Sequence, residues 1–150
     1  MESKLRQKLR ERRDQVALEA IEADLGVLGT GGALPPGGEP GWVRAAIDRS
    51  LSTGTEPDEL LADDTPPEEL DAWIEGLLAT HGMTGKLYVA SHVVLRPWLE
   101  CDVPATGWAA RLRDAIEDPW MFLAGPLDRL VVVTEAEYCF ECHVSRASGP

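Results

Sequence analysis

The stretch from Leu127 to Val144 constrains the fold most, because it has the most regular periodicity in the chain. A run rich in β-branched residues ends at Thr134, a polar corner follows at Glu135 and Ala136, and a second run then alternates apolar and polar residues. This pattern predicts a β-hairpin. With the corner at those two residues, the expected cross-strand pairs are Val133 with Tyr138, Val131 with Phe140, Arg129 with Cys142 and Leu127 with Val144.

Those pairs form the face of the hairpin that we expect to be buried. The opposite face is half polar, as in an antiparallel sheet that faces water or a partner. It carries Thr134, Val132, Leu130 and Asp128 opposite Glu137, Cys139, Glu141 and His143. Because Asp128 and His143 are expected to be neighbours there, they are interpreted as an exposed ion pair.

The rest of the chain predicts further strands and several helices. Short apolar runs indicate strands near 86–90 and 120–123, while Pro97 argues against a central strand position in the segment around it. Apolar residues at helical spacing indicate helices at 42–51, from Thr65 to His81, and at 106–117. We therefore predict an α+β fold with a small antiparallel sheet (strands near 86–90, 120–123, 127–134 and 137–144), helices packed on one face, and an N-terminal helical arm.

The N-terminal region predicts an amphipathic helix over residues 1–25, with a pattern that runs to about residue 28. Its first half is basic, and its second half carries an apolar stripe at Leu18, Ile21, Leu25 and Leu28. That stripe indicates either self-association or docking through this helix, or packing on its own domain. The basic half is a second candidate contact, for nucleic acid.

Residues 26–41 contain seven glycines and three prolines in sixteen positions, which predicts a linker to a single α+β domain at 42–150. A phosphate-binding loop is the alternative for this stretch. However, Leu34 stands where a third glycine would be needed, and no Gly-Lys-Ser/Thr motif follows.

The formal net charge of −12 is large for 150 residues and is unevenly distributed. Residues 1–13 hold six Lys or Arg against two Glu, whereas residues 14–150 hold eight against twenty-four and so carry −16. This charge repels nucleic acid and anionic lipid and favours a basic protein partner. No Lys or Arg lies between Arg49 and Lys86, so the predicted partner-binding residues are Asp58, Glu59, Asp63, Asp64, Glu68 and Glu69. Part of this run also fits a helix start near Pro67, where carboxylates are favoured.

Cys139 and Cys142, followed by His143, spell the motif of c-type haem attachment. In a strand, however, the two thiols point to opposite faces, which argues against haem and against a dithiol redox pair. Zinc is the alternative if a bulge replaces the strand, with Cys139, Cys142, His143 and Cys101 as ligands and His92 or His81 as substitutes for one of them. The expected state is without cofactor or metal.

No catalytic residues are predicted, because Ser91 and His92 would point away from each other in a strand. The absence of an apolar N-terminal segment predicts a cytoplasmic protein, and 11 arginines against three lysines suggest a bacterial gene of high GC content. The expected function is a non-catalytic acidic protein-binding module that docks onto or inhibits a basic partner, as an immunity-type or antitoxin-like inhibitor does. The alternatives are a zinc-binding protein or a subunit of a larger assembly held by the N-terminal helix.

Overall fold

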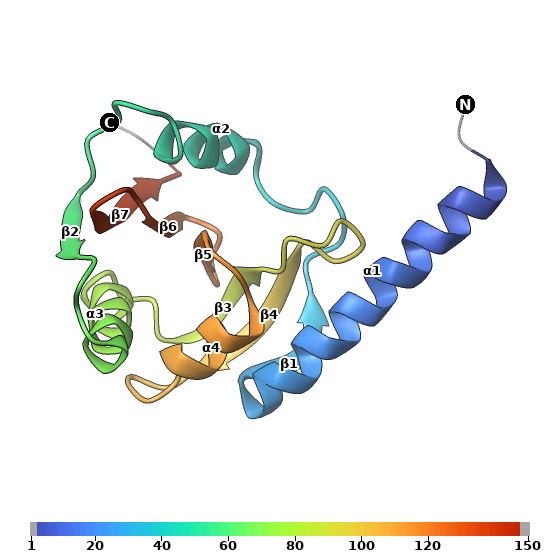
Figure 1. Ribbon diagram of the computed structural model, residues 1–150, viewed down its shortest axis with the longest axis horizontal. Helices are drawn as coiled ribbons and strands as arrows, with labels where there is room; N and C mark the ends of the chain where they lie inside the picture. The colour runs from blue at the N-terminus through green and yellow to red at the C-terminus, as the bar shows by residue number, and fades with distance from the viewer. Residues whose placement is uncertain (1–2, 148–150) are drawn as a thin grey trace.

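The computed structural model describes residues 3–147 and has an α+β fold in which helices pack on an antiparallel sheet (Figure 1). In the described part of the chain the sheet has seven strands in the order β1-β4-β3-β5-β6-β7-β2. The strands are β1 (Gly29–Ala33), β2 (Glu59–Ala62), β3 (Gly85–Ala90), β4 (Trp98–Val103), β5 (Trp120–Ala124), β6 (Arg129–Glu135) and β7 (Cys139–Arg146). The helices are α1 (Lys4–Leu25), the short 3-10 helix η1 (Gly26–Leu28), α2 (Gly41–Ser50), α3 (Pro67–Thr80) and α4 (Ala109–Ala115).

The α+β class, the antiparallel sheet with its four predicted strands, and the N-terminal helix are confirmed. Strands β1, β2 and β4 were not predicted. β4 begins immediately after Pro97 and lies between β1 and β3, so that proline bounds the strand rather than interrupting it. β2 lies inside the acidic run, where only two leucines give an apolar signal.

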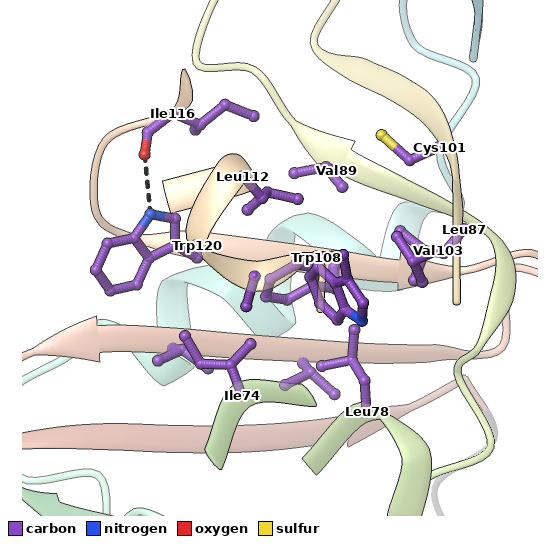
Figure 2. Packing of buried hydrophobic residues seen from close by; sticks show 14 of the residues in the cluster. Ile74, Leu78, Leu87, Val89, Cys101, Val103, Trp108, Leu112, Ile116 and Trp120 are labelled. Atoms are coloured by element: carbon purple, nitrogen blue, oxygen red, sulfur yellow. Dashed lines mark hydrogen bonds between the residues drawn. The ribbon is translucent and has the colours of Figure 1, made fainter. Parts of the chain in front are cut away.

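One face of the sheet packs against α1, α3 and α4 and holds the larger core (Figure 2). Trp108, just before α4, lies at its centre and meets the ring of Phe122 edge-on at a centroid separation of 5.8 Å. Leu78 from α3 and Leu112 from α4 are fully buried in the same cluster. Trp120 is held at the margin by a hydrogen bond of 2.9 Å from its Nε1 to the carbonyl oxygen of Ile116.

The second face of the sheet packs against α2, so the hairpin face that we expected to be exposed is largely buried. Val43 and Ile47 of α2 share a cluster with Leu130 and Val132 of β6. All five residues of β5, the central strand, are buried, as expected for a strand covered on both faces. The helix 42–51 was predicted from its apolar stripe, but its position on this second face was not.

The β6–β7 hairpin forms with a register four residues away from the predicted one. Val133 pairs with Cys142 and Val131 with Val144, because the loop lies at residues 136–138 and not at 135–136. An even shift keeps every side chain on its predicted face. Phe140 and Cys142 therefore still face the larger core, while Tyr138 leaves the sheet and is exposed in the loop.

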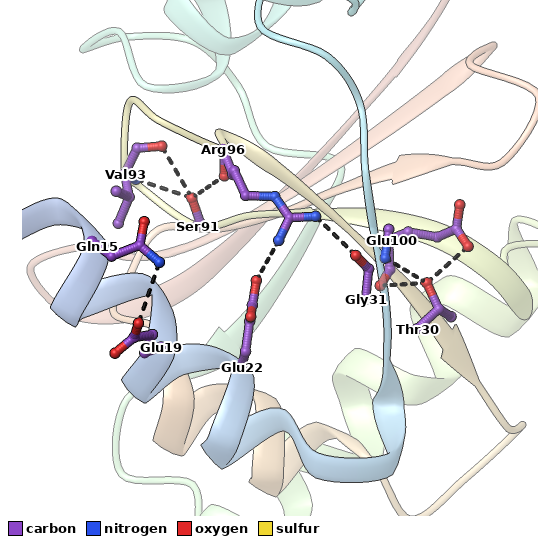
Figure 3. Close-up of polar contacts among 10 residues, drawn as sticks. Gln15, Glu19, Glu22, Thr30, Gly31, Ser91, Val93, Arg96 and Glu100 are labelled. Carbon is purple, nitrogen blue, oxygen red and sulfur yellow. Dashed lines mark hydrogen bonds and ion pairs between the residues drawn. The ribbon is translucent and has the colours of Figure 1, made fainter. Parts of the chain in front are cut away.

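The first part of the expected linker is built into the sheet, which differs from the sequence-based prediction. Residues 29–33 form β1, which pairs with β4 through an irregularity at which Gly31 has a positive φ of 85°. Arg96 fixes this strand to α1: its Nη2 donates to the carbonyl oxygen of Gly31 at 2.9 Å, and its Nη1 lies 2.6 Å from Oε1 of Glu22 (Figure 3). Only residues 34–40 connect β1 to α2, and within them Leu34 is buried.

The apolar stripe of α1 is used within the chain. Leu18, Leu25 and Leu28 are buried in the larger core and Ile21 is half buried against it. The predicted self-association through these four residues is therefore replaced by packing on the chain's own domain. The first half of α1 extends past the sheet, and its side chains are exposed (Figure 1).

Candidate protein-docking surface

The residues predicted to contact a partner lie along one edge of the sheet and at the start of the helix that follows. β2 is the last strand of the sheet and pairs only with β7 in the described part of the chain. Glu59 lies in this edge strand, Asp63 and Asp64 lie in the turn after it, and Glu68 and Glu69 lie in the first turn of α3. All five side chains are exposed, and so is Glu56 just before the strand.

Asp58 differs from these neighbours because its carboxylate has a role in the fold. Its Oδ2 accepts a hydrogen bond of 2.7 Å from the backbone N–H of Val144, and its own N–H donates to the carbonyl oxygen of Cys142 at 2.8 Å. Asp58 thus fixes the start of β2 to β7. Among residues 3–147, Asp58 is the one member of the predicted set whose carboxylate accepts a hydrogen bond.

The acidic run continues into α3, where two carboxylates point inward. Asp71 lies 2.6 Å from Nε of Arg113, and both side chains are mostly buried. Glu75 is buried, and its Oε2 accepts hydrogen bonds from the backbone N–H groups of Gly107, Trp108 and Ala109 at 2.8 to 3.0 Å. These contacts satisfy the N–H groups at the start of α4, which have no partner inside that helix.

An apolar side chain that sequence reasoning passed over lies among the exposed acids. Leu60 is 60% exposed on β2, whereas Leu61 beside it packs against the larger core. In the sequence, two consecutive leucines between acidic residues indicate a strand with one leucine exposed and the other buried. The surrounding run of acidic residues obscured this pattern. The surface therefore combines an unpaired strand edge, one exposed apolar side chain and surrounding carboxylates. We call Glu56, Glu59, Leu60, Asp63, Asp64, Glu68 and Glu69 the acidic edge.

The cysteine set proposed for zinc is not brought together. Cys139 and Cys142 lie on opposite faces of β7, and Cys101 lies on β4, which three strands separate from β7. Strands are about 4.8 Å apart, so Cys101 is on the order of 19 Å away. Among residues 3–147, no group of three or more His, Cys, Asp or Glu side chains is arranged to hold a metal ion.

The two buried thiols are also poor ligands. Burial, followed by the nearby charge of Glu100, raises the pKa of Cys101 to about 12. Burial, followed by the charges of Asp58 and Glu59, raises the pKa of Cys142 to about 12. Near neutral pH both thiols are therefore protonated, and binding a metal there would require the loss of these protons.

The histidines are placed differently from the sequence-based expectation. His143 is buried on the α2 side of β7, with Nε2 3.2 Å from Oε1 of Glu141, and it pairs with Val132. Asp128 instead contacts Nε of Arg129 at 3.2 Å, so the predicted ion pair between Asp128 and His143 is wrong. The register shift explains the difference, because it moves His143 away from the start of β6.

His92 has a structural role, and a cavity lies beside it. Its Nε2 is 2.8 Å from the carbonyl oxygen of Pro119 and 3.1 Å from that of Glu117. The hydroxyl of Ser91 donates to backbone oxygens of its own loop, including that of Arg96 at 2.7 Å. Ser91 and His92, although adjacent in sequence, therefore do not form a nucleophile and its base.

The cavity beside His92 measures about 250 Å³, and most of its lining residues are apolar: Glu39, Arg44, Ala90, His92, Val93, Val94, Pro97, Trp98 and Met121.

A scan against protein-family models, a search of curated proteins and a search of solved structures each return no match to this chain. Within the described part of the chain, no helix is both long enough and apolar enough to cross a membrane.

Proposed function

We propose that the protein is a non-catalytic, acidic protein-binding module that docks onto a basic partner through the acidic edge and thereby inhibits or neutralises it, as immunity-type or antitoxin-like inhibitors do. The observation that carries this proposal is an exposed group of six carboxylates around an unpaired edge strand, with no Lys or Arg in the sequence between Arg49 and Lys86. Such a surface attracts a basic protein over long range.

The edge strand adds short-range contacts to this attraction. An unpaired strand edge offers backbone N–H and C=O groups to an extended segment of a partner, and side chains at alternate positions then set specificity. Leu60 provides an exposed apolar contact on the edge strand, and the exposed Glu59 and Asp63 add negative charge near it in the sequence. A basic, extended segment of the partner fits both features.

The acidic charges chiefly govern the rate of association. Exposed charges at the rim of an interface accelerate encounter, and salt screens them beyond a distance of ~8 Å at physiological ionic strength. We therefore expect a fast association rate that falls steeply with salt. The dissociation rate is expected to depend more on Leu60 and the backbone of β2 than on the charges.

The test is a comparison of three forms of the protein immobilised in parallel. The first is wild type, and the second neutralises the acidic edge with Glu56→Gln, Glu59→Gln, Asp63→Asn and Asp64→Asn. The third is a matched control that removes the same charge from exposed positions elsewhere: Asp48→Asn, Asp102→Asn, Glu117→Gln and Glu137→Gln. Glu68 and Glu69 are left unchanged because they also stabilise the start of α3.

Each form is exposed to soluble cell extract at low salt, washed and eluted with a salt gradient. The proposal expects one or more basic proteins to be retained by wild type and by the control but not by the acidic-edge variant. With a partner recovered in this way, the association rate constant should drop by about tenfold in the acidic-edge variant and hardly change in the control. Retention of the same proteins by all three forms would overturn the proposal.

A further inference from the structure

The outer face of α1 carries apolar side chains that nothing in the described part of the chain covers. Leu5, Leu9 and Val16 are 68%, 58% and 52% exposed. Their spacings of four and seven residues place them on one face of the helix. Val16 precedes the buried Leu18 by two residues, or roughly 200° around the helix, so this face is opposite to the one that packs on the core.

The same face continues with small residues along the second half of α1. Ala20 and Ala23 follow Val16 by four and seven residues, and both are exposed although this half of the helix packs on the body. The outer face therefore changes from large side chains, at the projecting end, to small ones, beside the body. No helix or strand of residues 3–147 lies over either part (Figure 1).

The charges of α1 change sign at the same place. Residues 4–13 hold six Lys or Arg and one Glu, whereas residues 14–25 hold four acidic residues and no basic one. This order is the reverse of what the helix dipole favours, and no acidic side chain lies in the first turn and no basic one in the last. A lone helix is destabilised by this order, but an antiparallel neighbour with the same order compensates for it at both ends.

We propose that α1 joins two copies of this chain, with the outer faces of the two helices packed antiparallel. A pairing centred on Asp14 places Leu5 of one copy opposite Ala23 of the other, and Leu9 beside Ala20. Large side chains then meet small ones at both ends, which lets the helices approach closely. The same register brings Arg6 next to Asp24 of the second copy. Glu22 takes no part in this contact, because its Oε1 lies 2.6 Å from Nη1 of Arg96 in its own chain.

The charge pattern is what selects a second copy as the occupant. A parallel pair would place the two basic halves together and the two acidic halves together. A polyanion such as nucleic acid would match the basic half only, and residues 14–150 carry −16, which repels it. An antiparallel pair also keeps the two acidic bodies at opposite ends of a helix of about 33 Å.

The size of the contact sets its expected strength. A single pair of 22-residue helices gives an interface at the small end of the range for specific complexes. We therefore expect a reversible dimer with a dissociation constant in the micromolar range, stronger at low salt. Sedimentation equilibrium of the full chain over a wide concentration range measures both quantities.

The first test removes the apolar contact. Leu5→Ser with Leu9→Ser should raise the dissociation constant by at least about tenfold, because both side chains are lost twice in a symmetric dimer. The matched control is Leu51→Ser with Tyr138→Ser, which removes two exposed side chains from the end of α2 and from the loop between β6 and β7. Circular dichroism checks that α1 remains helical in each variant.

The second test reads the orientation of the two helices. Arg6→Glu should weaken an antiparallel dimer by about tenfold at low salt, and adding Asp24→Lys should restore it. A parallel dimer would instead be strengthened by Arg6→Glu, because the substitution relieves repulsion between the two basic halves. A wild-type chain that stays monomeric, a dimer that survives the leucine substitutions, or equal loss in the control would overturn the proposal.

Discussion

The nine carboxylates between Glu56 and Glu75 form one continuous acidic run in sequence but two groups in the fold. Asp58, Asp71 and Glu75 each accept a hydrogen bond or form an ion pair with a defined partner. The other six are exposed, and no hydrogen bond or ion pair joins their side chains to the described residues. The first group has structural roles, while the second provides the acidic edge.

The difference shows that charge density alone does not define a docking surface. Glu75 lies on the inward side of α3, where its burial is tolerable only because three N–H groups meet its carboxylate. Glu68 and Glu69 lie on the same helix but about two turns earlier, where they face water. Helical position therefore separates two roles that the residue type does not.

The largest effect should follow the loss of Glu75. Glu75→Ala leaves three backbone N–H groups at the start of α4 without an acceptor, two of them in buried surroundings. We expect the free energy of unfolding to fall by about 4 kcal/mol, since each bond is to a charged group. Urea denaturation followed by tryptophan fluorescence measures this, because Trp108 lies at the affected turn.

Two companion variants separate this role from charge in general. Glu75→Gln keeps one acceptor oxygen and should cost less than Glu75→Ala. Glu69→Ala removes an exposed carboxylate from the same helix and should cost under about 1 kcal/mol. Equal losses for Glu75→Ala and Glu69→Ala would show that the division between the two groups is wrong.

A smaller effect is expected at Asp71. Asp71→Ala leaves the mostly buried guanidinium of Arg113 without its carboxylate, although the stacking of Arg113 over Trp120 at 5.8 Å is retained. The expected loss is about 1 to 2 kcal/mol, between the values for exposed and buried pairs. A double-mutant cycle with Arg113→Ala measures the coupling energy between Asp71 and Arg113. A coupling energy near zero would mean that Asp71 has no structural role and belongs with the six exposed carboxylates.

The fold was predictable where one pattern dominated a segment. The hairpin, β3, β5 and the helices around Ile47, Ile74 and Leu112 have clear periodicity, and each forms at about the expected place. β1 was not predictable because GTGGA has no apolar alternation, and its place is fixed by distant partners such as Arg96 and Glu100. The hairpin register failed because the turn chemistry at residues 135–138 allows more than one loop.

The candidate surface was predictable as a charge run but not in its detail. The exposure of Asp63 and Glu68 followed from their place in a turn and at a helix start. The structural role of Asp58 depends on the pairing of β2 with β7, which brings Asp58 to Val144, 86 residues further along the chain. A single sequence carries no local signal for such a contact. Leu60 differs, because its alternation with Leu61 was a local signal and only the surrounding charge run obscured it.

The next smaller effect on stability is expected at Asp58, where substitutions can separate the contribution of the hydrogen bond from that of the negative charge. Asp58→Ala removes the acceptor for the N–H of Val144 and should cost about 1 kcal/mol. Asp58→Asn keeps an acceptor oxygen and should cost much less. Amide hydrogen exchange at Val144 should accelerate in the first variant and not in the second, and matching exchange in both would mean that charge, not the hydrogen bond, fixes β2.

The smallest effect on stability, and the clearest contrast, is expected for the acidic edge. Neutralising Glu56, Glu59, Asp63 and Asp64 together removes mutual repulsion and no described hydrogen bond. Each substitution should change the free energy of unfolding by less than about 0.5 kcal/mol, with a combined effect that is neutral or slightly stabilising.

The dependence of stability on salt concentration is the most sensitive test of this last prediction. Added salt screens repulsion among exposed charges, so it should stabilise wild type more than the neutralised variant. The expected result is a smaller salt-induced rise in the urea midpoint for the variant, with an unchanged m-value because the folded surface is the same. A loss of several kcal/mol in the variant would mean that these carboxylates have partners in the fold, and the acidic edge would then join Asp58, Asp71 and Glu75 as part of the structure.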